Sequence, residues 1–415
     1  MNTTTKHTIR SAFFACLMLL AAAACRKEEF QQQPHGEPMP YADTARHDVR
    51  GLLAVSPFKL FDAAWRRSHM DELMASKPPS MRFTILAVDD AAMTAAGFSA
   101  AGIAAASPET LDSMLRFHVL VEAVDTTALR LQTRNVGKKT LFESTTLQEM
   151  LNRVGSNVTY PEPYNYRQFI SAGADGELIV NGKHTGSRRP LFARNGVVWP
   201  VNRVLEFPRQ HALDYLASDP RFSLFVALEH WCDSVWTEAS WGYFQRTTFS
   251  SLRPNMSNGA IQQEMFLAPT NEAFAAAGFR TLEDLVNLNM RSLPYMDMDW
   301  FEMRNGFVTD TLLSYHGLGR MYAPVGSWGP GAGSMAVFFS SDLNASLSGF
   351  VLNVTDGLLP PYYMPLVFSS GNGKITIRLP AGTHTATVTD ADIRTLEGPI
   401  HAVDRLIVPA NLQLP

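Results

Sequence analysis

The chain has 415 residues, of which 46% are hydrophobic and 18% are charged. That length suits two ordinary globular domains, and the composition excludes a disordered or fibrous chain. The formal net charge is -4, and loss of residues 1–24 would leave 33 bases against 39 acids, a charge of -6. An acidic balance argues against a nucleic-acid partner, because neutralising a phosphate backbone needs a basic surface.

The first 24 residues have the layout of a signal peptide. Lys6 and Arg10 form a positive start, and the apolar run that follows is too short to span a bilayer. The run Leu20-Ala21-Ala22-Ala23-Ala24-Cys25 resembles a lipobox. The resemblance implies cleavage before Cys25, lipidation of that cysteine and stable attachment to a membrane. The alternative is a plain secretory signal followed by a cysteine that is there by chance.

Arg26-Lys27-Glu28-Glu29 directly follows the candidate lipidated cysteine. This short basic and acidic run resembles the export signal that carries some lipoproteins to the outer face of the Gram-negative outer membrane. It therefore implies an outer-membrane protein, lipid-anchored and exposed at the cell surface. The alternative is a solvated run of charges. Residues 25–50 are rich in Gln, Pro, Gly and charge, and we expect a lipidated tether there.

Three cysteines occur in the whole sequence. Cys16 would leave with the signal peptide and Cys25 would carry lipid, which leaves Cys232 alone. One cysteine cannot form an intrachain disulfide, so apolar burial must stabilise the folded part. Beside Trp231, Cys232 is expected to be a small buried hydrophobic residue.

The globular part contains an internal repeat. Residues 86–98 align without gaps to residues 267–279, with seven of thirteen positions identical. Residues 114–120 match residues 312–318, and residues 201–205 match residues 403–407. The offset grows from 181 to 198 to 202, so we expect insertions in the second copy, largely in a surface loop at 317–333. These matches predict one domain at 51–208 and a second at 209–415, after signal peptide 1–24 and tether 25–50.

The expected elements of the second copy combine helices and strands. The apolar spacing from Leu213 to Leu228 predicts two helices separated at Asp219-Pro220. Thr270 or Asn271 can cap the helix that follows the first strand, and Gly278 can end it. The remaining expectations are a first strand at 265–268, a hairpin turn at 371–375, and later strands at 374–379, 385–389 and 402–408. Helices that precede strands favour the α+β class.

Residues 266–274, Phe-Leu-Ala-Pro-Thr-Asn-Glu-Ala-Phe, resemble the first signature of the fasciclin family. Tyr315-His316 resembles its second signature, and residues 354–357 and 400–409 resemble its strands. The first copy is similar but lacks the Pro-Thr pair and has Phe117-His118 in place of Tyr-His. The resemblance implies two tandem fasciclin-like domains, each a β-wedge or sandwich with packed helices. It also implies adhesion or protein–protein interaction, with no catalytic residues and no cofactor.

Two interpretations apply to the aromatic–histidine pairs. In some animal fasciclin proteins the Tyr-His pair is linked to partner binding, so the resemblance makes Tyr315, His316, Phe117 and His118 candidate partner-binding residues. The alternative is structural, with the aromatic ring buried and the imidazole bonded to backbone groups. The structural interpretation is the stronger.

Other aromatic residues indicate an alternative function. Rings on loops can stack on sugars or form protein hot spots, which makes Tyr322 and Trp328 candidate contacts. A second aromatic group clusters at 231–244. We therefore consider a glycan-binding accessory of an outer-membrane uptake system beside the adhesion hypothesis. No spacing of histidines and cysteines predicts a metal site, and we expect no enzyme. An Asp297–Asp299 carboxylate pair in an undetected hydrolase is a third, weaker alternative.

Overall fold

The computed structural model describes residues 46–152, 159–173, 175–186, 189–249, 252, 260–261, 263–318, 337–353, 362–382, 384–410 and 412. Residues 45–415 form one compact unit. The sequence predictions for the signal peptide, Cys25, most of the tether and the segment with Tyr322 and Trp328 therefore lie outside the described residues. Among the described helices, none is both long and apolar enough to cross a membrane.

The first copy begins with helices and continues into strands. Its helices are α2 (Val49–Val55), α3 (Lys59–Arg67), α4 (Met70–Ala75), α5 (Asp90–Ala95), α6 (Ala100–Ala105), α7 (Pro108–Phe117) and α8 (Thr126–Arg130). Its strands are β1 (Phe83–Val88), β2 (Val119–Leu120), β3 (Val136–Asn152), β4 (Thr159–Ala172), β5 (Leu178–Val180), β6 (Lys183–His184), β7 (Leu191–Ala193) and β8 (Gly196–Val201). The described chain is therefore globular from α2 onward.

The second copy has the same sequence of helices before strands. Its helices are α9 (Ala212–Ser218), η2 (Pro220–Phe222), α10 (Ser223–Ala239), α11 (Asn271–Ala276), α12 (Leu282–Asn289), α13 (Val308–Leu312), η4 (Ser340–Asp342) and η5 (Ala345–Leu347). Its strands are β9 (Ala260–Ile261), β10 (Met265–Pro269), β11 (Tyr295–Asp297), β12 (Glu302–Arg304), β13 (Gly317–Leu318), β14 (Val351–Asn353), β15 (Tyr362–Tyr363), β16 (Val367–Gly371), β17 (Lys374–Arg378), β18 (Thr385–Arg394) and β19 (Pro399–Val403). The molecule is α+β, as predicted.

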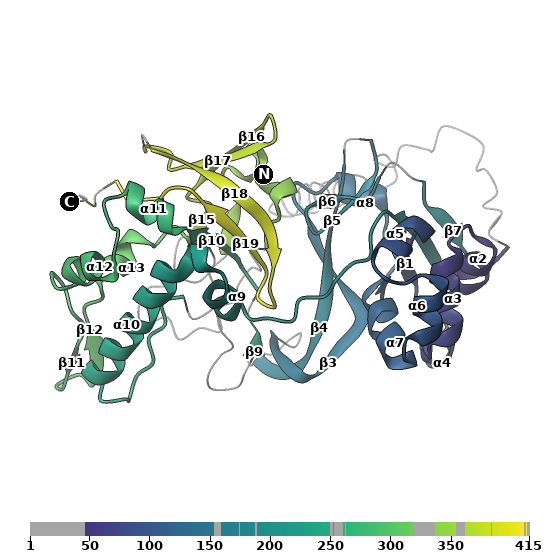
Figure 1. Ribbon diagram of the computed structural model, residues 1–415, viewed down its shortest axis with the longest axis horizontal. Coiled ribbons are helices and arrows are strands. Elements are labelled where there is room, and N and C mark those ends of the chain that lie inside the picture. The colour runs from purple at the N-terminus through teal and green to yellow at the C-terminus, as the bar shows by residue number, and fades with distance from the viewer. Residues whose placement is uncertain are drawn as a thin grey trace, which may run out of the picture. The chain divides into compact units, whose positions relative to one another are not determined.

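Two main sheets organise the described strands (Figure 1). The first has the order β6-β5-β4-β3-β2-β1-β8-β7, and β9 of the second copy also pairs with β3. The second has the order β13-β10-β19-β18-β17-β16. β1 lies parallel to β8 and antiparallel to the short strand β2, and β10 lies parallel to β19 and antiparallel to the short strand β13. The two copies therefore share one topology at their centres.

The strand registers match the offsets found in the sequence. Leu86 pairs with Trp199 in the first copy, and Leu267 pairs with His401 in the second. These positions differ by 181 and by 202, as in the alignment. Thr84 pairs with Leu120 and Met265 with Leu318, which differ by 181 and by 198. The described strands therefore confirm the internal repeat residue by residue.

The helix after the first strand is capped in the same way in each copy. The Asp89 carboxylate accepts the Ala92 N–H at 2.8 Å, and the Thr270 hydroxyl accepts the Ala273 N–H at 3.2 Å. Short oxygen side chains are favoured here because the first N–H groups of a helix have no partner within the helix. Gly278 follows α11 with φ +96°, the left-handed conformation expected from the sequence.

The residue after each cap bonds to an earlier helix. Asp90 accepts the N–H of Leu60, at the start of α3, with a distance of 2.9 Å. Asn271 accepts the N–H of Leu224, at the start of α10, with a distance of 3.0 Å. Each side chain thus supplies an acceptor for the first turn of a helix formed by a distant part of the chain. Of the two residues predicted as possible caps of α11, Thr270 caps that helix, while Asn271 bonds to the start of α10.

Most of the predicted elements of the second copy are present. The chain breaks between α9 and α10 at Asp219-Pro220, and β16 and β17 join through Asn372 and Gly373. Both turn residues have positive φ, which the two-residue hairpin turn requires. The prediction of a strand at 402–408 was wrong at its end, because β19 stops at Val403. Beyond it the Ile407 N–H is donated to the His316 ring rather than to a strand.

Each copy has an apolar core of its own. The core of the first copy consists of apolar residues between Val49 and Leu205, and Ile261 and Leu396 of the second copy also belong to it. In the second copy, alternate residues of β10 face opposite ways. Phe266 and Ala268 pack toward the helices, while Met265 and Leu267 pack toward η4, η5 and β16–β18. Alternation with period two places one strand in two cores.

Candidate binding surface

The two histidines of the aromatic–histidine pairs lie at equivalent places and are fully buried. In the first copy, His118 Nε2 accepts the Leu205 N–H at 2.9 Å, and its Nδ1 lies 2.8 Å from the Met114 carbonyl. In the second copy, His316 Nε2 accepts the Ile407 N–H at 3.1 Å, and its Nδ1 lies 2.6 Å from the Leu267 carbonyl. His118 therefore ties the closing segment to α7, and His316 ties it to β10.

These contacts require neutral imidazoles. A ring nitrogen that accepts an N–H cannot carry a proton, and its partner nitrogen must donate to the carbonyl. Burial lowers the pKa of both His118 and His316 to about 4, although the carbonyl contact raises it in part. Burial also lowers the pKa of His401, which lies on β19 of the second sheet. At neutral pH the rings are structural links without charge.

The aromatic members of the pairs also pack inward. Phe117 is fully buried and meets the Tyr166 ring edge-on at 6.2 Å between centroids. Tyr315 is half-buried against the core on the β16–β18 side. A partner could reach Phe117, His118 and His316 only if the fold opened. Their positions fit the structural interpretation, in which the pairs hold each copy together.

The other residues singled out in the sequence are placed as follows. Cys25, Arg26, Lys27, Glu28 and Glu29 lie outside the described residues, as do Tyr322 and Trp328. Cys232 is fully buried on α10, where burial raises the pKa of its thiol to about 12. Its sulfur lies 3.6 Å from the Asn289 amide nitrogen. A thiol with so high a pKa is unreactive at neutral pH, as expected of a packing residue.

Figure 1 shows the β11–β12 hairpin beside the end of α10, and aromatic residues of both segments are exposed. The turn after α10 and the hairpin carry five residues that we call the aromatic surface: Trp241, Tyr243, Phe244, Trp300 and Phe301. The Phe301 ring centroid lies 5.5 Å from those of both Tyr243 and Phe244. Trp300 is 74% exposed, Tyr243 66% and Trp241 65%. Exposed rings in such numbers mark contact areas more often than scattered surface residues do.

Two of these residues have an unusual backbone. Trp241 and Phe301 both have φ of +50°. The left-handed region is uncommon for bulky side chains and costs on the order of 1–2 kcal/mol. Such conformations persist only where the surrounding structure enforces them, and they concentrate at functional sites. Here they direct two rings of one exposed group outward from tight turns.

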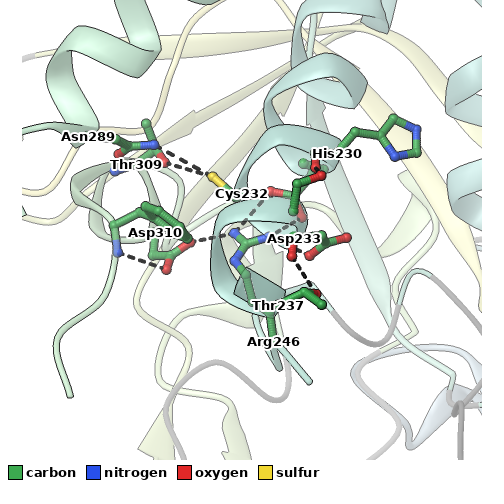
Figure 2. A network of polar contacts seen from close by, with 11 residues as sticks. His230, Cys232, Asp233, Thr237, Arg246, Asn289, Thr309 and Asp310 are labelled. Atoms are coloured by element: carbon green, nitrogen blue, oxygen red, sulfur yellow. Dashed lines mark hydrogen bonds and ion pairs between the residues drawn. The ribbon is translucent and has the colours of Figure 1, made fainter. Parts of the chain in front are cut away.

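A buried arginine fixes the turn that carries the rings. The Arg246 guanidinium lies 2.8 Å from Glu229 and 3.3 Å from Asp233, both on α10, and 2.5 Å from Asp310 on α13. Figure 2 shows it lying between the two helices, with Asp310 on one side and Asp233 on the other. The Arg246 side chain is only 2% exposed. Because it follows Phe244 by two residues, the ion pairs anchor the aromatic turn to both helices.

The charges of this cluster depend on one another. Burial disfavours the charged Arg246, but Glu229 and Asp310 outweigh burial and raise its pKa further above the ordinary value. Burial raises the pKa of Glu229, and Arg246 opposes that rise. The arginine therefore remains cationic, and removing it would leave carboxylates in the protein interior. Within the described residues, no group of three metal-ligating side chains is arranged to hold a metal ion.

Acidic groups flank the aromatic surface. Asp297 accepts the backbone N–H groups of Asp299 and Trp300 and pairs with Arg304 at 3.2 Å, so it shapes the hairpin turn. Glu302 pairs with the same arginine. The exposed Asp299 carboxylate, in the described part of the chain, has neither hydrogen bond nor ion pair. The surface thus combines exposed rings with a carboxylate that solvent or a ligand can reach.

The sequence indicated three of the five residues of this surface, Trp241, Tyr243 and Phe244. The cluster of aromatic residues at 231–244 was visible, and Trp231 and Trp236 pack against the core as the simpler interpretation held. Trp300 and Phe301 were missed, because only the fold brings the hairpin beside α10. Arg246 was missed as well, since its partner Asp310 lies 64 positions away.

The comparisons with known proteins are sparse. No family profile matches the chain, and no curated protein matches it. Among solved structures, the chain is similar to the FAS1 domain pair of the insect cell adhesion molecule Fasciclin I. The likeness has 12% sequence identity and a TM-score of 0.30, and it covers 85% of this chain and 96% of that chain.

Proposed function

We propose that this protein is a surface-anchored lipoprotein that mediates adhesion or protein–protein interaction through two fasciclin-like halves. The observation that carries the proposal is the aromatic surface, which is exposed, backed by a buried ion-pair cluster and held by strained turns. Trp, Tyr and Arg dominate the energetics of protein contacts, because large rings bury much area at little entropic cost. The partner that fits is a protein with apolar pockets and a basic rim, which would complement Asp299 and its acidic neighbours.

Adhesion by living cells tests this proposal. Strains with the gene deleted are complemented with wild type, with Trp241→Gly plus Trp300→Ser, or with Phe192→Ser. Glycine suits the left-handed backbone at position 241, so that change removes a ring without adding strain. Phe192 is 70% exposed on β7 of the first copy and serves as the matched control. We expect wild type and the control to restore adhesion to protein-coated surfaces and the double variant to fail. Equal adhesion by intact and deleted strains would refute the proposal.

The anchor requires a separate experiment. We propose that lipid on Cys25 holds the protein in the outer membrane, with Arg26–Glu29 directing it to the cell surface. Labelled palmitate should enter wild type and should not enter Cys25→Ala. Protease added to whole cells should digest wild type, whereas replacing Arg26–Glu29 with neutral residues should protect it. Palmitate labelling of the Cys25→Ala protein would contradict the assignment.

A second candidate function rests on the exposed Asp299 carboxylate beside Trp300. Rings can stack on the apolar face of a sugar while a carboxylate accepts its hydroxyl groups, so a neutral glycan also fits the aromatic surface. A glycan array screened with wild type and with the double variant separates the candidates. Binding of a neutral glycan that disappears in the variant would favour capture of glycans for uptake over adhesion to protein.

A further inference from the structure

A pocket of about 460 Å³ lies in the second copy, apart from the aromatic surface. One wall is the face of α11 that carries Ala273, Ala276 and Ala277. The opposite walls are β17, the start of β18 and the segment that follows β19. The three alanines leave room that larger side chains would fill. The volume lies within the roughly 300–1,000 Å³ typical of small-molecule sites.

The interior of the pocket is apolar. Besides the alanines, aliphatic residues from three segments line it, namely Ile377, Leu379, Leu406, Ile407, Val408 and Leu412. Several of them belong to the cores on either side of the second sheet and are held in place by that packing. A hydrocarbon chain placed there would remove apolar surface from water, worth about 25 cal/mol per Å².

Arg405 supplies a positive charge to the lining of the pocket. Arg405 and His384 are the only ionisable side chains among its described lining residues, and both are exposed. Neither of them makes an ion pair with a carboxylate in the parts of the chain that the structure describes. A guanidinium presents paired donors that match the two oxygens of a carboxylate. The pocket is therefore apolar inside and cationic at its exposed side.

We propose that this pocket binds a single-chain amphiphile with a carboxylate head, a fatty acid in chemical terms. The hydrocarbon chain lies against the alanines of α11, and the carboxylate is held by Arg405. The complementarity is twofold, because an alkyl chain matches the aliphatic walls and an anion matches the cationic rim. This site is independent of the adhesion proposal, since none of its residues belongs to the aromatic surface.

Calorimetric titration of the full chain with sodium dodecanoate, kept below its micelle concentration, tests the site. Two kinds of variant address its two halves. Ala276→Leu fills the apolar interior, with Ala275→Leu as its control, since Ala275 is exposed on the same helix and does not line the pocket. Arg405→Gln removes the charge, with the exposed Arg280→Gln as its control. We expect each pocket variant to weaken dodecanoate binding at least tenfold and each control to change it less than twofold.

Two further probes identify the head group. Dodecan-1-ol should bind wild type and Arg405→Gln equally, and dodecyltrimethylammonium should bind wild type more weakly than dodecanoate does. Circular dichroism checks that all variants remain folded, and Arg405→Gln keeps the test decisive if Ala276→Leu does not fold. The proposal is overturned if wild type gives no saturable heat with dodecanoate, if Arg405→Gln binds dodecanoate as wild type does, or if the cationic probe binds as tightly as the anionic one.

Discussion

The two copies share their centre and differ at their edges. In each copy a buried histidine accepts an N–H of the closing segment. In each, an Asp or Asn side chain also accepts an N–H in the first turn of an earlier helix. The first copy extends its sheet through the long strands β3 and β4, whereas the second carries the β11–β12 hairpin and the aromatic surface. The difference teaches that the repeated residues hold the fold, while the exposed aromatic rings lie on additions to the second copy.

The buried ion pairs give the largest expected difference between the copies. Arg246 faces three carboxylates, while Arg167 of the first copy pairs, within the described residues, with the single carboxylate of Glu149 at 2.6 Å. Removing one partner of a buried pair costs roughly 3–5 kcal/mol, because the remaining charge stays buried. We expect Arg246→Met to lower the free energy of unfolding by the upper end of that range and Arg167→Met by less. Urea unfolding measures both, with the exposed Arg291→Met as control. A smaller loss for Arg246→Met than for Arg167→Met would show that a carboxylate beside Arg246 is already protonated in the folded protein.

The histidine links should be equivalent. His118→Ala and His316→Ala each leave a backbone N–H without its acceptor and open a cavity. We expect a loss of about 2–4 kcal/mol in the free energy of unfolding for each. The two losses should agree to within about 1 kcal/mol, and the exposed His230→Ala should change stability by less than about 0.5 kcal/mol. If one copy tolerates the change and the other does not, the differing contacts of Nδ1, with Met114 in one copy and Leu267 in the other, outweigh the shared contact of Nε2.

Acid should weaken both copies together. The folded pKa of His118 and His316 is about 4, below the unfolded value near 6.5, so the unfolded chain binds protons first as the pH falls. Their contribution to stability is fully present above pH 6.5 and is lost progressively between pH 6.5 and 4. At pH 5.5, preferential protonation of each histidine in the unfolded chain should lower the free energy of unfolding by about 1 kcal/mol relative to pH 7.5. Urea unfolding at the two pH values measures the loss, which His316→Ala should reduce. An unchanged pH dependence in that variant would contradict the assignment.

Much of the shared centre could be predicted from the sequence, because it depends on local chemistry repeated at fixed offsets. The caps at Asp89 and Thr270, the left-handed Gly278 and the registers of β1 and β10 all follow from the aligned segments. The candidate surface could not be predicted in full, since it depends on contacts between distant segments. Phe301 meets Tyr243 only because the hairpin packs on α10, and no periodicity in the sequence encodes that contact.

The bond from Asn271 to Leu224 has a consequence for the folding of the chain. It closes a loop of 47 residues, against 30 residues for the equivalent bond in the first copy. The entropic cost of closing a loop grows with the logarithm of its length, so the longer loop costs about 0.4 kcal/mol more. The insertion that carries the aromatic turn therefore adds little to the cost of capping α10, which is why an addition of this size can be accommodated there.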